Sequence, residues 1–130
     1  MFINFSNHPS TCWGKNQIKA AEVYGEIVDI PFPAVPADSD EAGIQELADT
    51  YIAKIRAYRP ACVLCQGEFT LAYRVIHELL QEGIKTVAAC SDRVCREYAI
   101  DGITEKTAIF EFVRFREYGD AQKGEKRGEQ

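Results

Sequence analysis

The chain has 130 residues, of which 46% are hydrophobic and 27% are charged, and its formal net charge is −5. These values are typical of one globular domain with its own core. No apolar run approaches the roughly 18 to 20 residues that span a bilayer, and no basic flank with an apolar stretch opens the chain. We therefore expect a cytoplasmic protein without a membrane segment. The negative net charge argues against a protein that coats long nucleic acid, although backbone N–H groups could still hold a small anion.

The five cysteines predict reduced thiols, because their number is odd and no secretion signal accompanies them. They are Cys12, Cys62, Cys65, Cys90 and Cys95. The Cys62-x-x-Cys65 pair resembles a metal or redox motif, but residues three apart on a strand point to opposite faces. We expect buried thiols here, and neither a metal nor a cofactor.

The first half of the chain alternates strand and helix patterns. Residues 1–6 and 26–32 read as strands, and residues 13–24 read as a helix that stops at Gly25. Three prolines at 31, 33 and 36 predict an extended loop. A helix starts at residues 38–41, and its apolar side chains recur at helical spacing up to Ile55.

The apolar run 61–65 reads as a buried strand that leads through the turn 66–68 into a helix over 69–82. Residues 84–89 form a fourth strand, which ends in a polar turn at 90–93. Short connections between alternating strands and helices require parallel crossovers. The sequence therefore predicts an α/β fold, a Rossmann-like three-layer sandwich with a mainly parallel sheet.

The last part of the fold should be an antiparallel hairpin, with strands at 95–100 and 103–115 joined at Asp101-Gly102. Period-two spacing places Phe110, Phe112 and Arg114 on one face of the second strand, and Phe115 on the other. We expect one domain over residues 1–118 and a disordered polar tail over 119–130.

Polar turns follow three of the predicted strands, and parallel strands bring such turns to one edge of a sheet. The candidate binding residues in and beside these turns are Ser6, Asn7, Ser10, Trp13, Gln66, Gly67, Thr70, Ser91 and Arg93. The candidate catalytic groups are His8 and Glu68, which can move protons. Each has a structural alternative: His8 could bond local backbone, and Glu68 could complement a helix dipole.

Other assignments are also open. Gln66 and Thr70 suit a base edge or a ribose hydroxyl, whereas Trp13 could stack on a base or lie in the core. Arg93 could hold a phosphate or pair with Asp92. No Gly-x-Gly-x-x-Gly loop, Gly-x-x-x-x-Gly-Lys loop or Gly-x-Ser-x-Gly elbow is present, so a conventional dinucleotide, nucleoside triphosphate or hydrolase site is not expected.

Four segments together resemble small stand-alone CRISPR-associated proteins with a CRISPR-associated Rossmann (CARF) fold. They are Phe2-Ile-Asn-Phe-Ser-Asn-His-Pro9, Gln66-Gly-Glu-Phe-Thr70, Ala89-Cys-Ser-Asp-Arg93 and Phe112-Val-Arg-Phe-Arg-Glu-Tyr118. The likeness covers most of residues 1–118, and its most telling part is the opening segment, in which Asn7 stands between the serine and the histidine.

This resemblance implies a homodimer that binds a cyclic oligoadenylate, or another small nucleotide, across its two-fold axis. Some relatives are ring nucleases, which cleave the ring without metal by setting a ribose 2′-hydroxyl against the adjacent phosphate. The alternatives are a non-catalytic nucleotide sensor, an interaction module that uses Phe110 and Phe112, or an unrelated enzyme of nucleotide metabolism.

Overall fold

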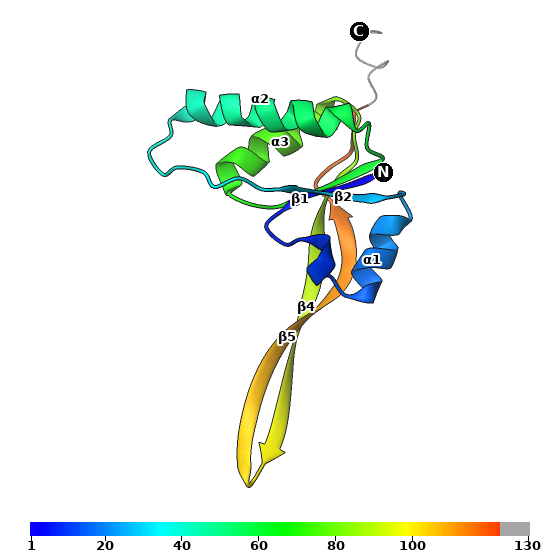
Figure 1. Ribbon diagram of the computed structural model, residues 1–130, viewed down its shortest axis with the longest axis vertical. Coiled ribbons are helices and arrows are strands. Elements are labelled where there is room, and N and C mark those ends of the chain that lie inside the picture. The colour runs from blue at the N-terminus through cyan, green and yellow to red at the C-terminus, as the bar shows by residue number, and fades with distance from the viewer. Residues whose placement is uncertain (123–130) are drawn as a thin grey trace.

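The computed structural model describes residues 1–122 and is built on one five-stranded sheet in the order β2-β1-β3-β4-β5 (Figure 1). β1, β2, β3 and β4 run parallel to one another, and β5 runs antiparallel to β4. The strands are β1 (Phe2–Ser6), β2 (Ile27–Pro31), β3 (Cys62–Cys65), β4 (Thr86–Ile100) and β5 (Ile103–Glu117). The predicted α/β class and mainly parallel sheet with a C-terminal hairpin are confirmed.

Helices lie on both faces of the sheet, α1 on one and α2 with α3 on the other (Figure 1). They are the short 3-10 helix η1 (Ser10–Cys12), α1 (Lys15–Glu22), α2 (Glu41–Ala57) and α3 (Phe69–Gln81). Asp40 caps α2 by accepting a hydrogen bond from the Gly43 N–H at 2.9 Å. The helix predicted over 13–24 is present as the shorter α1, and η1 precedes the predicted range.

Strand alternation divides the buried side chains into two cores. Ile3, Phe5 and Cys65 face α2 and α3, whereas Phe2 and Cys62 face α1. All five residues of β1 are buried, because this strand is central and covered on both sides. The expected divergence of Cys62 and Cys65 to opposite faces is confirmed.

β4 does not end in a polar turn at residues 90–93, so that prediction was wrong. It continues to Ile100 and pairs with β5 along its whole length, and the predicted turn at Asp101-Gly102 closes the hairpin. Both turn residues have positive φ, 50° and 77°. The segment from Ser91 to Phe112, called the arm below, projects beyond the helices as a two-stranded ribbon (Figure 1). Because most of the arm lies beyond the helices (Figure 1), polar residues are tolerated within a strand there.

A β-bulge corrects the predicted faces of β5. Cys90 pairs with Arg114 but Ser91 pairs with Phe112, which leaves Val113 as an extra residue. Phe112 and Phe115 therefore share a face, and their ring centroids are 4.8 Å apart, whereas Arg114 lies on the opposite face. Simple period-two counting fails at such an insertion.

The predicted tail falls mostly on residues 123–130, which lie outside the described residues. Before them, the backbone N–H of Gln122 donates to the Leu80 carbonyl oxygen at 2.7 Å, so the chain is still attached to the end of α3 at this point. Within residues 1–122, no helix is long and apolar enough to span a membrane.

Candidate functional site

The loop after β1 is held by hydrogen bonds that converge on the backbone of His8. The side-chain amide of Asn4 donates to the His8 carbonyl oxygen at 2.8 Å, and Trp13 Nε1 donates to the same oxygen at 3.2 Å. The Ser6 hydroxyl donates to Asn4 Oδ1 at 2.6 Å and accepts from the His8 N–H at 3.2 Å. The backbone of His8 is fixed in this way, while its side chain is exposed.

Asp29 of β2 supports the same loop. Its carboxylate accepts from the side chain of Asn4 at 3.0 Å and from the Ser10 hydroxyl and N–H at 3.0 Å and 3.1 Å. Ser10 is therefore bound to the protein itself, and Asn7 is exposed beside it. The sequence prediction missed Asp29, although a carboxylate between isoleucine and valine residues of a strand was a visible signal.

A groove of about 1000 Å³ lies between this loop, α1 and the root of the arm. We call it the α1 groove. Five of the predicted site residues line it, which are Ser6, His8, Trp13, Gln66 and Ser91. Predicted residues from the ends of β1 and β3 and from β4 thus do meet at one place.

The N-terminus of α1 forms one wall of the α1 groove. Gly14 is the N-cap residue and has no side chain to bond the free N–H groups of the first turn. Gly14, Lys15, Asn16 and Gln17 all line the groove. The positive end of the helix dipole and the Lys15 ammonium group together favour an anionic ligand.

The opposite wall is aromatic and belongs to the arm. Phe110 and Phe112 line the groove with Glu111, and Phe110 is 73% exposed. Trp13 lines the groove and also packs on Phe2 and Phe115, with ring centroids 6.1 and 6.2 Å away, so it belongs to both the core and the site. From the sequence, the two phenylalanines were assigned only to a partner surface. Their place in the groove depends on the bulge, which the sequence does not signal.

Gln66 joins the groove to the sheet. Its side-chain Oε1 accepts from the backbone N–H of Ala89 at 2.9 Å, beyond the last ladder pair of β3 and β4, Leu64 with Val87. At the point where β3 ends and β4 continues toward the arm, the Gln66 side chain thus makes the hydrogen bond to β4 that a neighbouring strand would make. The Gln66 amide group fixes the root of the arm as well as lining the groove.

The structure does not bring Glu68 and Thr70 to the α1 groove. Glu68 is the N-cap of α3, and its carboxylate accepts from the Thr70 N–H at 2.8 Å, the Leu71 N–H at 3.0 Å and the Thr70 hydroxyl at 2.6 Å. The Thr70 hydroxyl and these backbone donors lower the pKa of the Glu68 carboxyl. Both residues line a separate hollow beside the start of α2. The dipole and capping alternative for Glu68 accounts for its contacts.

Gly67 serves packing more directly than ligand approach. A Cβ at this position would lie 2.5 Å from three carbons of the Phe32 ring, which is buried in the core. Arg93 lies on the exposed arm opposite Phe110 and does not line the groove.

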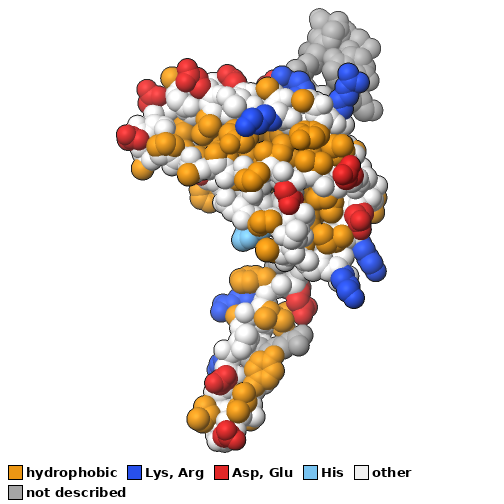
Figure 2. All heavy atoms as spheres, viewed as in Figure 1, with side chains coloured by type: hydrophobic (Ala, Val, Ile, Leu, Met, Phe, Trp, Pro, Cys, Tyr) orange, Lys and Arg blue, Asp and Glu red, His pale blue; other side chains and the backbone are white. Residues whose placement is uncertain are grey.

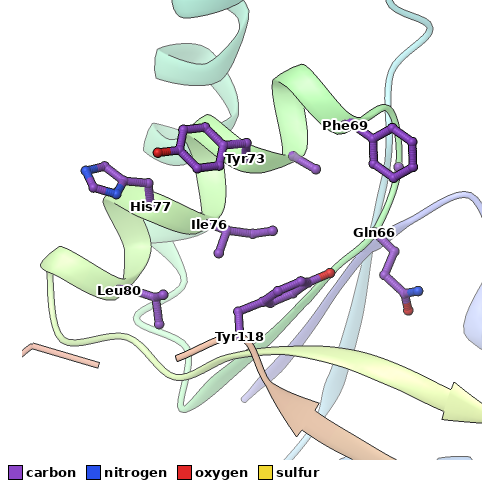
Figure 3. Close-up of a pocket in the computed structure, with 9 residues that line it drawn as sticks. Gln66, Phe69, Tyr73, Ile76, His77, Leu80 and Tyr118 are labelled. Atoms are coloured by element: carbon purple, nitrogen blue, oxygen red, sulfur yellow. The ribbon is translucent and has the colours of Figure 1, made fainter. Parts of the chain in front are cut away.

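A second hollow, of about 590 Å³, follows the outer side of α3 and is named the α3 groove (Figure 3). It is lined by Gln66, Gly67, Phe69, Ala72, Tyr73, Ile76, His77, Leu80 and Tyr118. Figure 3 shows the Tyr118 ring at the end of β5 lying below Ile76, with its hydroxyl directed away from Leu80. This hydroxyl donates to the Cys65 carbonyl oxygen at 2.6 Å. This groove is mainly apolar, unlike the α1 groove.

Residues 1–116 match a family model described as the Uncharacterized protein MJ1673 family. The chain belongs to this family. The region matched to the MJ1673 family contains the whole of the α1 groove and the whole arm. No curated protein and no solved structure matches the chain.

Proposed function

We propose that this MJ1673-family chain is a cytoplasmic, Rossmann-like protein that binds a small nucleotide in the α1 groove, and that the nucleotide is a cyclic oligoadenylate. The observation that carries the proposal is one groove with an uncapped helix N-terminus and Lys15 on one wall and Phe110 and Phe112 on the other. Phosphates suit the first wall, and bases stack on the second. The resemblance to CRISPR-associated Rossmann proteins supplies the cyclic adenylate.

The residues of the groove divide by chemistry. The first-turn N–H groups of α1 and Lys15 would neutralise a phosphate, and the neutral side chains of Ser6, Gln66 and Ser91 would bond ribose and base edges. A cyclic oligoadenylate has a repeated unit of this kind. Two grooves in a homodimer would share one ring about a two-fold axis.

We further propose that the chain is a ring nuclease with His8 as its general base. The His8 side chain would take the proton of a ribose 2′-hydroxyl while that oxygen attacks the adjacent phosphorus. The bond to the 5′-oxygen breaks, this oxygen gains a proton from solvent, and a 2′,3′-cyclic phosphate remains. Hydrogen bonds that fix the His8 backbone support the role, because such a reaction depends mainly on orientation and on donors around the phosphate.

Calorimetry with cyclic tri-, tetra- and hexaadenylate tests the binding, and chromatography of the same mixtures tests the cleavage. We expect heat with one ring size and a cyclic-phosphate product. His8→Ala should slow cleavage about 100-fold or more while binding persists. His77→Ala is the matched control, because this second histidine lies on α3 outside the α1 groove, and light scattering checks that the variant keeps the oligomeric state of the unaltered chain. Absence of both heat and product with all three rings would overturn the proposal.

A sensor that binds the nucleotide without cleaving it is the second candidate. It is favoured by the position of Glu68, which leaves the groove with only one of the two predicted catalytic groups. The sensor predicts heat without product for the unaltered chain. If the chain is a ring nuclease, the unaltered chain should give both binding heat and product, and the Glu68→Gln variant should keep its turnover.

A further inference from the structure

The arm is an isolated ribbon whose tip carries exposed apolar side chains. From Ser91 to Ile100 it extends about 30 Å at ~3.3 Å per residue. Ile100 and Ile103 pair across the strands next to the turn and are 58% and 65% exposed, and Tyr98 on the same face is 47% exposed. Figure 2 shows hydrophobic side chains along the projecting arm. A two-stranded ribbon is marginally stable in water unless it packs on something, so this one needs a partner surface.

The same molecule carries an unfilled surface of matching character, the α3 groove. Phe69 and Tyr73 on its rim are 88% and 68% exposed, although they belong to a helix that packs on the sheet. The groove is a concave apolar surface, and the arm is a convex apolar one. Each copy of the chain thus has one arm to bury and one groove to fill.

Strand alternation relates the two surfaces. Val87 and Ala89 of β4 pack in the α1-side core, so the even-numbered residues of β4, which include Val94, Tyr98 and Ile100, continue the α3 side of the sheet. Because both apolar surfaces belong to one side of the sheet, a single two-fold rotation that reverses the arm direction can bring each arm to the groove of the other copy.

The charges at the two surfaces are complementary. At the tip, Glu97 and Lys106 pair with each other at 3.5 Å on the opposite face, which leaves Asp101 in the turn and Glu105 beside Tyr98 as the acidic groups near the apolar face. Tyr118 lines the α3 groove, and strand alternation places Arg114 and Arg116 of β5 on the same face as Tyr118. An acidic tip that enters the groove of a second copy would therefore meet two arginines at its edge.

We propose that the arm of each copy docks in the α3 groove of a second copy, which forms a reciprocal homodimer. The arm face is about 30 Å long and about 10 Å wide. Two such contacts in each copy approach the ~800 Å² per partner of a standard protein interface. This proposal does not depend on the nucleotide and survives if none binds.

Light scattering on the unliganded chain tests the proposal, with expected mass twice the chain mass of 14.6 kDa. Ile100→Lys with Ile103→Lys should raise the dimer Kd at least tenfold, and so should Tyr73→Lys in the groove. The matched arm control is Ala99→Lys with Thr104→Lys, which adds the same charges to the opposite face of the tip. The groove control is Ala53→Lys, at an exposed position of α2. Circular dichroism confirms that each variant is folded.

Mixing the arm variant with the Tyr73→Lys variant separates arm-to-groove docking from other dimers. Each variant alone retains no intact arm–groove contact, whereas a mixed dimer retains one, so the mixture should dimerise more strongly than either variant. If light scattering gave the mass of a single chain, 14.6 kDa, for the unaltered protein at 100 μM, the proposal would be overturned. Arm variants that dimerise like their controls, or a mixture no tighter than its components, would also overturn it.

Discussion

The Gln66-Gly67-Glu68 turn shows how three adjacent residues can serve three different purposes. Gln66 forms a hydrogen bond to β4, Gly67 leaves room for the ring of Phe32, and Glu68 caps α3. From the sequence, the turn read as one wall of a ligand site. Only Gln66 reaches the α1 groove, because the backbone turns back toward α2 immediately after it.

Replacing Gly67 with alanine tests the packing role at this position. The new methyl group would overlap the Phe32 ring, which is 7% exposed and surrounded by Phe5 and other core side chains. We expect the free energy of unfolding to fall by about 1–3 kcal/mol, as for an overpacked core. Urea denaturation followed by circular dichroism measures it.

Gly43→Ala is the control for this experiment. Gly43 lies in the first turn of α2, where the nearest atom to an added Cβ is 3.4 Å away. Alanine should leave the helix as stable or make it more stable. Equal effects of the two substitutions would show that Gly67 is not constrained by Phe32.

At the scale of elements, β4 separates what sequence can predict from what it cannot. The helix starts and stops and the first three strands followed from apolar periodicity, caps, glycines and prolines. The polar run Cys90-Ser91-Asp92-Arg93 also looked like a turn, because the usual test for a strand is a buried face. An extended ribbon has no such requirement, so the polar run at its root carried no local signal of strand structure, although the Asp101-Gly102 turn did predict the hairpin beyond it.

Beyond the end of β3, the contact with β4 depends on the hydrogen bond from the Ala89 N–H to the Gln66 side chain, and Gln66→Leu tests this dependence. Leucine has a similar size but leaves the Ala89 N–H without its acceptor. We expect a loss of about 1 kcal/mol in the free energy of unfolding and faster hydrogen exchange at the Ala89 amide. Exchange measured by NMR reports the amide directly.

Gln45→Leu is a suitable control for this change. The Gln45 side chain makes two hydrogen bonds, with Asp49 at 2.8 Å and Arg74 at 2.7 Å, but these bonds are at the surface, where water can replace them. Its effect on the free energy of unfolding should be smaller than that of Gln66→Leu. An unchanged Ala89 exchange rate in Gln66→Leu would contradict the bridging role.

For the whole molecule, burial of weak acids predicts a loss of stability in alkali. Burial raises the pKa of Cys62 and of Cys65 from 9.0 to about 12, and that of Tyr118 from 10.0 to about 12. Above about pH 9 the unfolded chain therefore releases protons that the folded chain still holds. The free energy of unfolding should be insensitive to these groups below pH 9 and should fall between pH 9 and pH 12.

Denaturant unfolding at a series of pH values measures this loss. Tyr118→Phe removes one of the three acids with a raised pKa, so the stability of this variant should decline less steeply with pH. Cys12→Ser is the control, because Cys12 is exposed in the folded chain and the change should leave the slope as it was. Stability that rises from pH 9 to pH 11 would contradict the assignment.

The candidate site was predictable in part for a reason that also concerns the whole molecule. Parallel topology brings strand ends to one edge, so the meeting of Ser6, His8 and Gln66 followed from the order of elements alone. The aromatic wall did not, because it comes from β5 after a bulge and a long antiparallel return. The hairpin itself was predicted, but the bulge that sets which side chains face the groove leaves no pattern in a single sequence.

The arm also has a consequence for the kinetics of folding. Its strands are joined by a two-residue turn, so the ribbon can close in about 1–10 μs, long before β1 finds β2 and β3. In the homodimer proposed above, the ribbon would gain its stability from a second copy and would form and dissolve repeatedly until two chains meet. The last step of folding would then be bimolecular, with a rate that rises in proportion to the concentration of the chain.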